Sequence, residues 1–151
     1  MIRVVVQETP IDIAAEFALA EADDAGAVAT FIGLVRGDDG VTELALEHYP
    51  GATERALEAL CAEAVARWTL AKAAVVHRVG PMVPGDRVVF VATTARHRGA
   101  ALEACAFLID RLKTGAPFWK RERRGGDARW VEARESDDAA AARWGEGAAP
   151  R

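Results

Sequence analysis

The chain has 151 residues, of which 51% are hydrophobic, and a formal net charge of −4 at pH 7. This length supports one domain with a sizeable core, and the acidic balance argues against general nucleic-acid binding. No apolar run approaches the roughly 18 residues of a membrane span. Cys61 and Cys105 form no CxxC pair, so a zinc site or redox dithiol is not expected, and both are predicted to be buried packing residues. We expect a cytoplasmic protein without a metal or cofactor.

The hydrophobic pattern predicts strands and helices in an irregular order. In chain order these are a strand (2–7), a helix (13–20), strands (27–35 and 42–48), a helix (57–68), strands (73–79 and 87–93), a helix (100–113) and a strand (129–135). The first strand alternates and is not a signal peptide, and Asp12 is a candidate N-cap for the first helix. Because strands outnumber helices without alternating with them, we predict a single α+β domain with mixed or antiparallel sheets packed by two main helices. It is expected to span residues 1–144, followed by a flexible tail over 145–151.

Positive charge is concentrated in the segment from Arg96 to Arg134. It holds ten Lys or Arg residues against five Asp or Glu, a local charge of +5 in an acidic protein. Such a stretch indicates either a local site for an anionic ligand or a solvated face balanced by acids elsewhere. Charge alone does not distinguish the two.

Lysine is rare in this chain, which has sixteen arginines and three lysines. Lys72 stands apart, whereas Lys113 and Lys120 lie seven residues apart and flank a predicted helix end at Gly115 and Pro117. An amine can lose its proton when desolvated, which a guanidinium does not, so lysine suits nucleophilic or acid–base work. Gly115 is expected to be a left-handed cap, and the aromatic pair at 118–119 is expected to anchor Lys120. The alternative is two surface lysines beside a helix stop.

Other basic side chains follow predicted strands. Arg96, His97 and Arg98 precede a predicted helix, where backbone amides and two guanidinium groups favour phosphate, although an exposed histidine between arginines is also typical of a solvated surface. Arg36 ends a strand before a Gly/Asp loop and is a further candidate, as is Arg134. The other two histidines, at 48 and 77, lie in strand-like runs and are predicted to be structural.

Several short motifs of this chain match those of a known protein family, in the same order along the sequence. They are Ala29-Thr30-Phe31-Ile32-Gly33 to Val35-Arg36, Leu46-Glu47-His48-Tyr49-Pro50-Gly51, Val76-His77-Arg78-Val79-Gly80, Pro84-Gly85-Asp86, His97-Arg98, Leu112-Lys113-Thr114 to Glu122, and Arg129-Trp130-Val131-Glu132-Ala133-Arg134. Together they cover nearly the whole chain, which resembles the large, catalytic subunit of molybdopterin synthase.

This resemblance implies an α/β hammerhead fold, a homodimer at the centre of a heterotetramer, and a small ubiquitin-like sulfur-carrier subunit at each end. The carrier's C-terminal Gly-Gly thiocarboxylate is expected to supply sulfur to cyclic pyranopterin monophosphate (precursor Z), giving the dithiolene of molybdopterin. Since Gly125-Gly126 is internal and the sequence ends Ala148-Ala149-Pro150-Arg151, a separate sulfur donor is expected.

By position, the resemblance implies that Lys113 and Lys120 are catalytic. The implied substrate-binding residues are Arg36, His97, Arg98, Arg121, Glu122 and Arg134, the last reaching across a dimer interface. Leu34 departs from the family, where lysine is frequent, and the loop after Arg36 is short. Two alternatives remain at this point: a non-catalytic anion-binding module, and a protein-interaction subunit that leaves catalysis to its partner.

Overall fold

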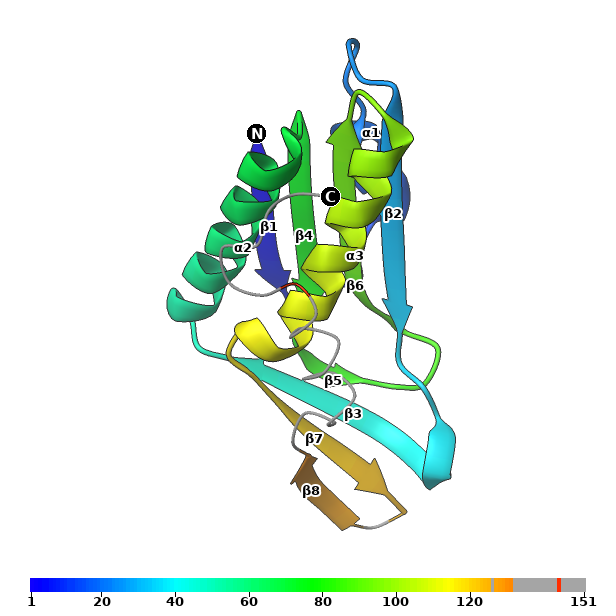
Figure 1. The fold of residues 1–151 in the computed structure, drawn as a ribbon. Coiled ribbons are helices and arrows are strands. Elements are labelled where there is room, and N and C mark those ends of the chain that lie inside the picture. The colour runs from blue at the N-terminus through cyan, green and yellow to red at the C-terminus, as the bar shows by residue number, and fades with distance from the viewer. Residues whose placement is uncertain (126, 132–143, 145–151) are drawn as a thin grey trace.

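Two four-stranded sheets and three α-helices make up the part of the chain that the computed structural model describes, residues 1–125, 127–131 and 144 (Figure 1). The strands are β1 (Ile2–Gln7), β2 (Ala27–Leu34), β3 (Val41–His48), β4 (Lys72–Arg78), β5 (Gly80–Met82), β6 (Arg87–Ala95), β7 (Phe118–Arg124) and β8 (Asp127–Val131). The helices are α1 (Ile13–Ala20), α2 (Ala52–Trp68) and α3 (Arg98–Gly115), with a 3-10 turn, η1, at Asp38–Gly40.

The first sheet has the strand order β1-β4-β6-β2, with β1 parallel to β4 and the other pairs antiparallel. Helices α2 and α3 cover one face and run in opposite directions, while α1 covers the other face (Figure 1). The mixed sheet and the two main helices confirm the predicted α+β class.

Alternation along the central strands fills both layers. Val75 of β4 and Val91 of β6 pack with Leu57 of α2 and Phe107 of α3, and all four are at most 1% exposed. The neighbouring Phe90 points to the α1 side. Successive side chains of a strand point to opposite faces of the sheet. Since helices cover both faces here, β4 and β6 each contain a continuous apolar run and do not alternate between apolar and polar residues.

The second sheet, of order β5-β3-β7-β8, is antiparallel throughout and lies beyond the end of the first sheet where α2 begins and α3 ends (Figure 1). Leu44 and Leu46 of β3 pack with Val79, which lies between β4 and β5, and with Met82, the last residue of β5. Val35, just after β2, completes this cluster. The small core joins the two sheets and positions β7.

Two local predictions, the N-cap at Asp12 and the burial of both cysteines, are confirmed. The side chain of Asp12 accepts a hydrogen bond from the backbone N–H of Ala15 at 3.1 Å, as an N-cap does. Both cysteines are buried and unpaired. No helix of the described segments is long and apolar enough to cross a membrane.

The segment after α3 differs from the prediction. Gly115 is the last helical residue and not a left-handed cap, because the chain leaves the helix through extended Ala116 (φ −112°, ψ 137°). Residues 118–124 form β7, which the sequence pattern did not predict, and Trp119 is 46% exposed, so it is not a buried anchor. The last strand begins at Asp127, two residues earlier than expected. The rest of that predicted strand, and the tail over 145–151, lie outside the described residues.

Candidate active site

Lys113 and Lys120 both lie near the junction of the two sheets. Lys113 is in the last turn of α3, and Lys120 is the third residue of β7. The ring of Phe118, which begins β7, stacks on His77 with centroids 4.1 Å apart, and the charge of Lys113 lies close enough to His77 to lower its pKa. The exposed end of α3 and the start of β7 therefore share the His77 side chain as a neighbour.

One face of β7 carries the ionic part of the site. Burial alternates along the strand, so residues 118, 120, 122 and 124 face inward and 119, 121 and 123 face outward. The carboxylate of Glu122, 8% exposed, lies 3.6 Å from Lys120 Nζ and 3.1 Å from Arg124 Nη2. In the β3–β7 pairing, Lys120 is opposite Leu46 and Glu122 is opposite Leu44. A buried carboxylate held between two cations fixes the direction of Lys120.

His77 is a neutral, buried histidine beside these charges. Its pKa is lowered from 6.5 to about 4, chiefly by burial, with smaller contributions from the nearby Lys113 and His48, while the hydrogen bond to Arg78 acts in the opposite direction. Its Nδ1 is 2.8 Å from the carbonyl oxygen of Arg78, so Nδ1 carries the proton and donates it, which leaves the lone pair on Nε2. The ring was predicted to be structural, and nothing in the sequence indicated that Lys113 approaches it.

His48, the second histidine of the junction, ends β3 opposite Phe118. Its Nε2 lies 3.8 Å from Glu54 in the first turn of α2, and Glu54 accepts a hydrogen bond from the N–H of Gly51 at 3.0 Å. Within the described residues, no three His, Cys, Asp or Glu side chains gather as a metal site. The described chemistry of the junction is therefore that of amines, carboxylates and imidazoles.

Arg36 flanks this junction. It follows β2, whose last residue Leu34 pairs with Arg87 at the start of β6, the same end of the sheet that carries His77. Its neighbour Val35 belongs to the small core that also contacts Phe118. The Arg36 guanidinium is exposed and lies 3.5 Å from the carboxylate of Asp38, so it remains accessible to an anion.

His97 and Arg98 are not brought to the lysines within one chain. They stand at the opposite end of α3, where His97 is the N-cap and Arg98 the first helical residue (Figure 1). At about 1.5 Å per residue, the fifteen-residue step from Arg98 to Lys113 spans roughly 22 Å. Both side chains are exposed. They fit a separate basic surface on each chain.

Two more predicted residues complete the set. Arg121 is exposed and lies on the face of β7 opposite to Lys120, so it does not share the inward face of the strand. Arg134 lies outside the described residues.

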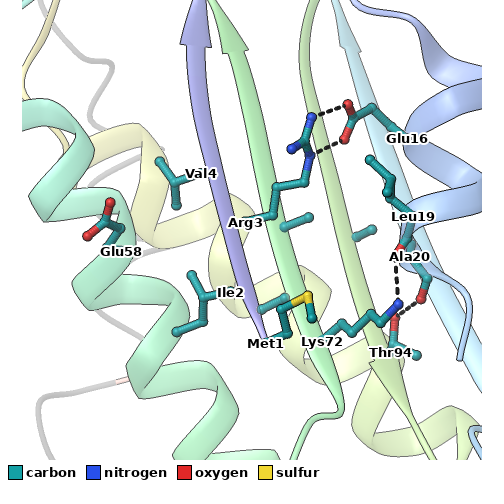
Figure 2. A pocket seen from close by; sticks show the side chains of 13 residues that line it. Met1, Ile2, Arg3, Val4, Glu16, Leu19, Ala20, Glu58, Lys72 and Thr94 are labelled. Atoms are coloured by element: carbon teal, nitrogen blue, oxygen red, sulfur yellow. Dashed lines mark hydrogen bonds and ion pairs between the residues drawn. The ribbon is translucent and has the colours of Figure 1, made fainter.

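The third lysine has a structural environment. Lys72 Nζ donates hydrogen bonds to the carbonyls of Leu19 and Glu21, at 2.9 and 2.7 Å, at the C-terminal end of α1. It lines a cavity of about 730 Å³ between β1 and α1, in which Arg3 and Glu16 form a two-bond ion pair (Figure 2). Lys72, Arg3 and Glu16 are thus engaged in contacts within the chain.

Comparison with known proteins agrees over most of the chain. The family described as MoaE protein matches residues 6–115. The molybdopterin synthase catalytic subunit of Escherichia coli is 51% identical over 146 residues, covering 94% of this chain and 97% of that protein. The same subunit of Yersinia pestis is 53% identical over 129 residues, covering 83% and 85%.

Solved structures give the same result. The molybdopterin biosynthesis MoaE protein of Burkholderia ambifaria has a TM-score of 0.83 and 50% identity, covering 96% of this chain and 99% of that one. Molybdopterin synthase of Staphylococcus aureus has a TM-score of 0.80 and 29% identity, covering 84% and 95%. These matches define a catalytic subunit of molybdopterin synthase, a sulfurtransferase of molybdenum cofactor biosynthesis. The chain belongs to the MoaE family.

Proposed function

We propose that Lys113 and Lys120 carry out the sulfur transfer of this subunit. The sulfur would come from the C-terminal Gly-Gly thiocarboxylate of a small ubiquitin-like carrier and pass twice to precursor Z, forming the dithiolene of molybdopterin. The observation that supports this most is the placement of both scarce lysines around one junction, with Lys120 held by Glu122 on the inward face of β7.

The two amines suit different parts of this reaction. A thiocarboxylate is an anion, and its sulfur first bonds to the substrate, which leaves the carrier attached as an acyl thioester. Water then adds to the acyl carbon to give a tetrahedral oxyanion, and the collapse of this oxyanion breaks the C–S bond, leaving the sulfur on the substrate and a carboxylate on the carrier. Lys113, at the exposed end of α3, is assigned to stabilise the carrier terminus and that oxyanion. Lys120 is assigned to orient the substrate or to move protons. Arg36 beside the junction is assigned to the substrate phosphate, and Glu122 to the orientation of Lys120.

A second copy of the chain explains the remaining residues. With His97 and Arg98 roughly 22 Å from Lys113 along α3, their contribution to the same substrate requires a neighbouring subunit. We therefore propose a homodimer in which His97 and Arg98, together with Arg134, reach the site of the partner. A Helicobacter pylori protein with this fold, 22% identical, was solved as a complex of subunits 1 and 2 of molybdopterin-converting factor. For this chain the proposed assembly is a heterotetramer of two catalytic and two carrier subunits, in the cytoplasm.

Charge-retaining variants test the lysines. Lys113→Arg and Lys120→Arg should each lower the rate of molybdopterin formation by at least about 100-fold. At position 120 a guanidinium does not exchange a proton near neutral pH, and at position 113 its larger planar group cannot take the place of the compact ammonium beside the oxyanion. The matched control is Lys72→Arg, which keeps a donor at the end of α1 and should retain the native rate. The assay mixes each variant with thiocarboxylated carrier and precursor Z, and product should require both. Near-native rates in both site variants would refute the assignment.

Complementation tests the shared site. A His97→Ala/Arg98→Ala chain and a Lys113→Ala chain should each be inactive alone. Their mixed dimer should recover activity, because it contains one site with all native residues. A mixture that exchanges subunits yet stays inactive would contradict the proposed sharing.

A further inference from the structure

The segment between the two lysines is short and has few backbone groups of its own that can fix its conformation. Six residues separate Lys113 from Lys120, and α3 ends within them at Gly115. Pro117 has no backbone N–H, so its carbonyl is the polar backbone group by which it can be held. Any freedom at this residue would alter the position of Lys120 relative to Lys113.

A buried hydroxyl from another helix contacts that carbonyl. Thr53, the second residue of α2, is 0% exposed, and its Oγ1 donates a hydrogen bond to the carbonyl oxygen of Pro117 at 2.9 Å. Thr53 Oγ1 also accepts a hydrogen bond from the N–H of Tyr49 at 2.8 Å. In return, the N–H of Thr53 donates to the carbonyl of Tyr49 at 2.9 Å. The hydroxyl thus uses its proton on Pro117 and a lone pair on Tyr49.

The anchor itself is well fixed. Gly51 adopts φ +85° in the turn before α2, and its N–H donates to the carboxylate of Glu54. On the other side of Pro117, the ring of Phe118 stacks on His77, and the N–H of Phe118 donates to the carbonyl of Ala116 at 3.0 Å. The Thr53 hydroxyl therefore ties the N-terminal turn of α2 to the middle of the segment that joins the lysines.

We infer that Thr53 is a positioning residue for sulfur transfer, which sets the relative placement of Lys113 and Lys120 through the carbonyl of Pro117. The inference rests on the proposed roles of the two lysines. Thr53 touches neither substrate nor carrier in this scheme and acts through the backbone. Displacements of about 1 Å in a catalytic group can cost roughly 100-fold in rate, so a lost anchor at this point should appear in kcat.

Thr53→Val removes the hydroxyl and keeps the shape of the side chain. We expect kcat for molybdopterin formation to fall at least about tenfold, with KM for precursor Z and for the thiocarboxylated carrier changed less than about threefold. Thr53→Ser restores the hydroxyl without the methyl group and should return kcat to within about threefold of the native value. Hydrogen exchange at the amides of residues 114–118 should become faster in Thr53→Val and stay near native in Thr53→Ser.

Thr94→Val is the matched control. Thr94 is also 0% exposed, and its hydroxyl donates to the carbonyl of Ala20 at 2.6 Å, in the layer of α1. This variant also loses one buried hydroxyl bond, so its melting temperature should fall much as that of Thr53→Val does. Its kcat and its exchange over residues 114–118 should remain native.

The outcomes separate the inference from the function on which it rests. If Lys113→Arg and Lys120→Arg are inactive but folded Thr53→Val has native kcat, the positioning role is wrong and the lysine assignment stands. Equal losses of kcat in Thr53→Val and Thr94→Val would also overturn it, as would a tenfold loss in Thr53→Ser. That last outcome decides the matter even if Thr53→Val does not fold. Near-native lysine variants would refute the proposed function, whereas exchange over residues 114–118 tests the anchor without activity.

Discussion

Acidification should destabilise the native chain through His77 by roughly 3 kcal/mol between pH 6.5 and pH 4. The ring is 6% exposed, and burial, followed by the charges of Lys113 and His48, lowers its pKa from 6.5 to about 4. In the unfolded chain the ring takes up its proton near pH 6.5, so the unfolded state binds more protons throughout this interval. A difference of one pKa unit corresponds to about 1.36 kcal/mol. The lowered pKa of His77 therefore gives the loss of roughly 3 kcal/mol in unfolding free energy by pH 4, of which about 2 kcal/mol is lost by pH 5.

The stabilising contribution is fully present above pH 6.5 and decreases as the pH falls toward 4. His77→Phe removes the titration and keeps an aromatic ring to stack on Phe118. The free energy of unfolding should be measured in urea at half-unit steps from pH 4.5 to 7.5 for both proteins. Carboxylates titrate in both, so the quantity of interest is the difference between the two profiles.

Between pH 7.5 and pH 5, the native chain should lose about 2 kcal/mol more unfolding free energy than His77→Phe does. The chain has three histidines, so the His77 resonance can be assigned by its loss in His77→Phe, and its NMR titration should give a pKa below 5. Parallel stability profiles, or a His77 pKa above 6, would refute the account of a neutral ring held beside Lys113.

Two further predictions concern buried groups. Burial raises the pKa of the Cys61 thiol to about 12, with a smaller contribution from Glu58, and that of Cys105 to about 11. Both thiols of the folded chain should therefore react with iodoacetamide at pH 8 at least about 100-fold more slowly than a free cysteine. In denaturant they should react at ordinary rates, and mass spectrometry can follow both reactions. Fast labelling of the folded chain would contradict this. Glu122→Gln removes the carboxylate between Lys120 and Arg124 and should lower the kcat of sulfur transfer about tenfold, whereas Glu47→Gln on the exposed face of β3 should not. Equal rates in the two variants would show that the carboxylate charge does not orient Lys120.

The elements with a strong hydrophobic period were predictable. Helix α2 buries Leu57, Cys61, Ala64 and Trp68 on one stripe, and this spacing is visible in the sequence. Strand β7 was missed for a physical reason. Its inward positions after Phe118 are Lys120, Glu122 and Arg124, so charge stands where a half-buried strand normally shows apolar residues. The ion pairs that replace those apolar contacts are part of the proposed site.

The composition of the site was partly predictable. The scarcity of lysine and the resemblance both indicated Lys113 and Lys120. Neither indicated that Thr53 and His77 contact the segment around Phe118, because these contacts connect residues 41 or more positions apart. The separation of His97 and Arg98 from the lysines could have been predicted from the sequence. A helix over 100–113 already implies roughly 20 Å between its ends.

Helix α3 also restricts which changes of length the protein can accept. One residue inserted or deleted in it would turn everything on one side by about 100° and move it by about 1.5 Å relative to the other. Arg98 and Lys113 stand at opposite ends, so such a change would misalign one basic end with respect to the other even if every contacting residue were kept. Substitutions on exposed positions such as Leu102 leave that spacing unchanged. Among homologues, α3 should therefore vary in composition while its number of residues stays constant, whereas the loop at 37–40 should vary in both.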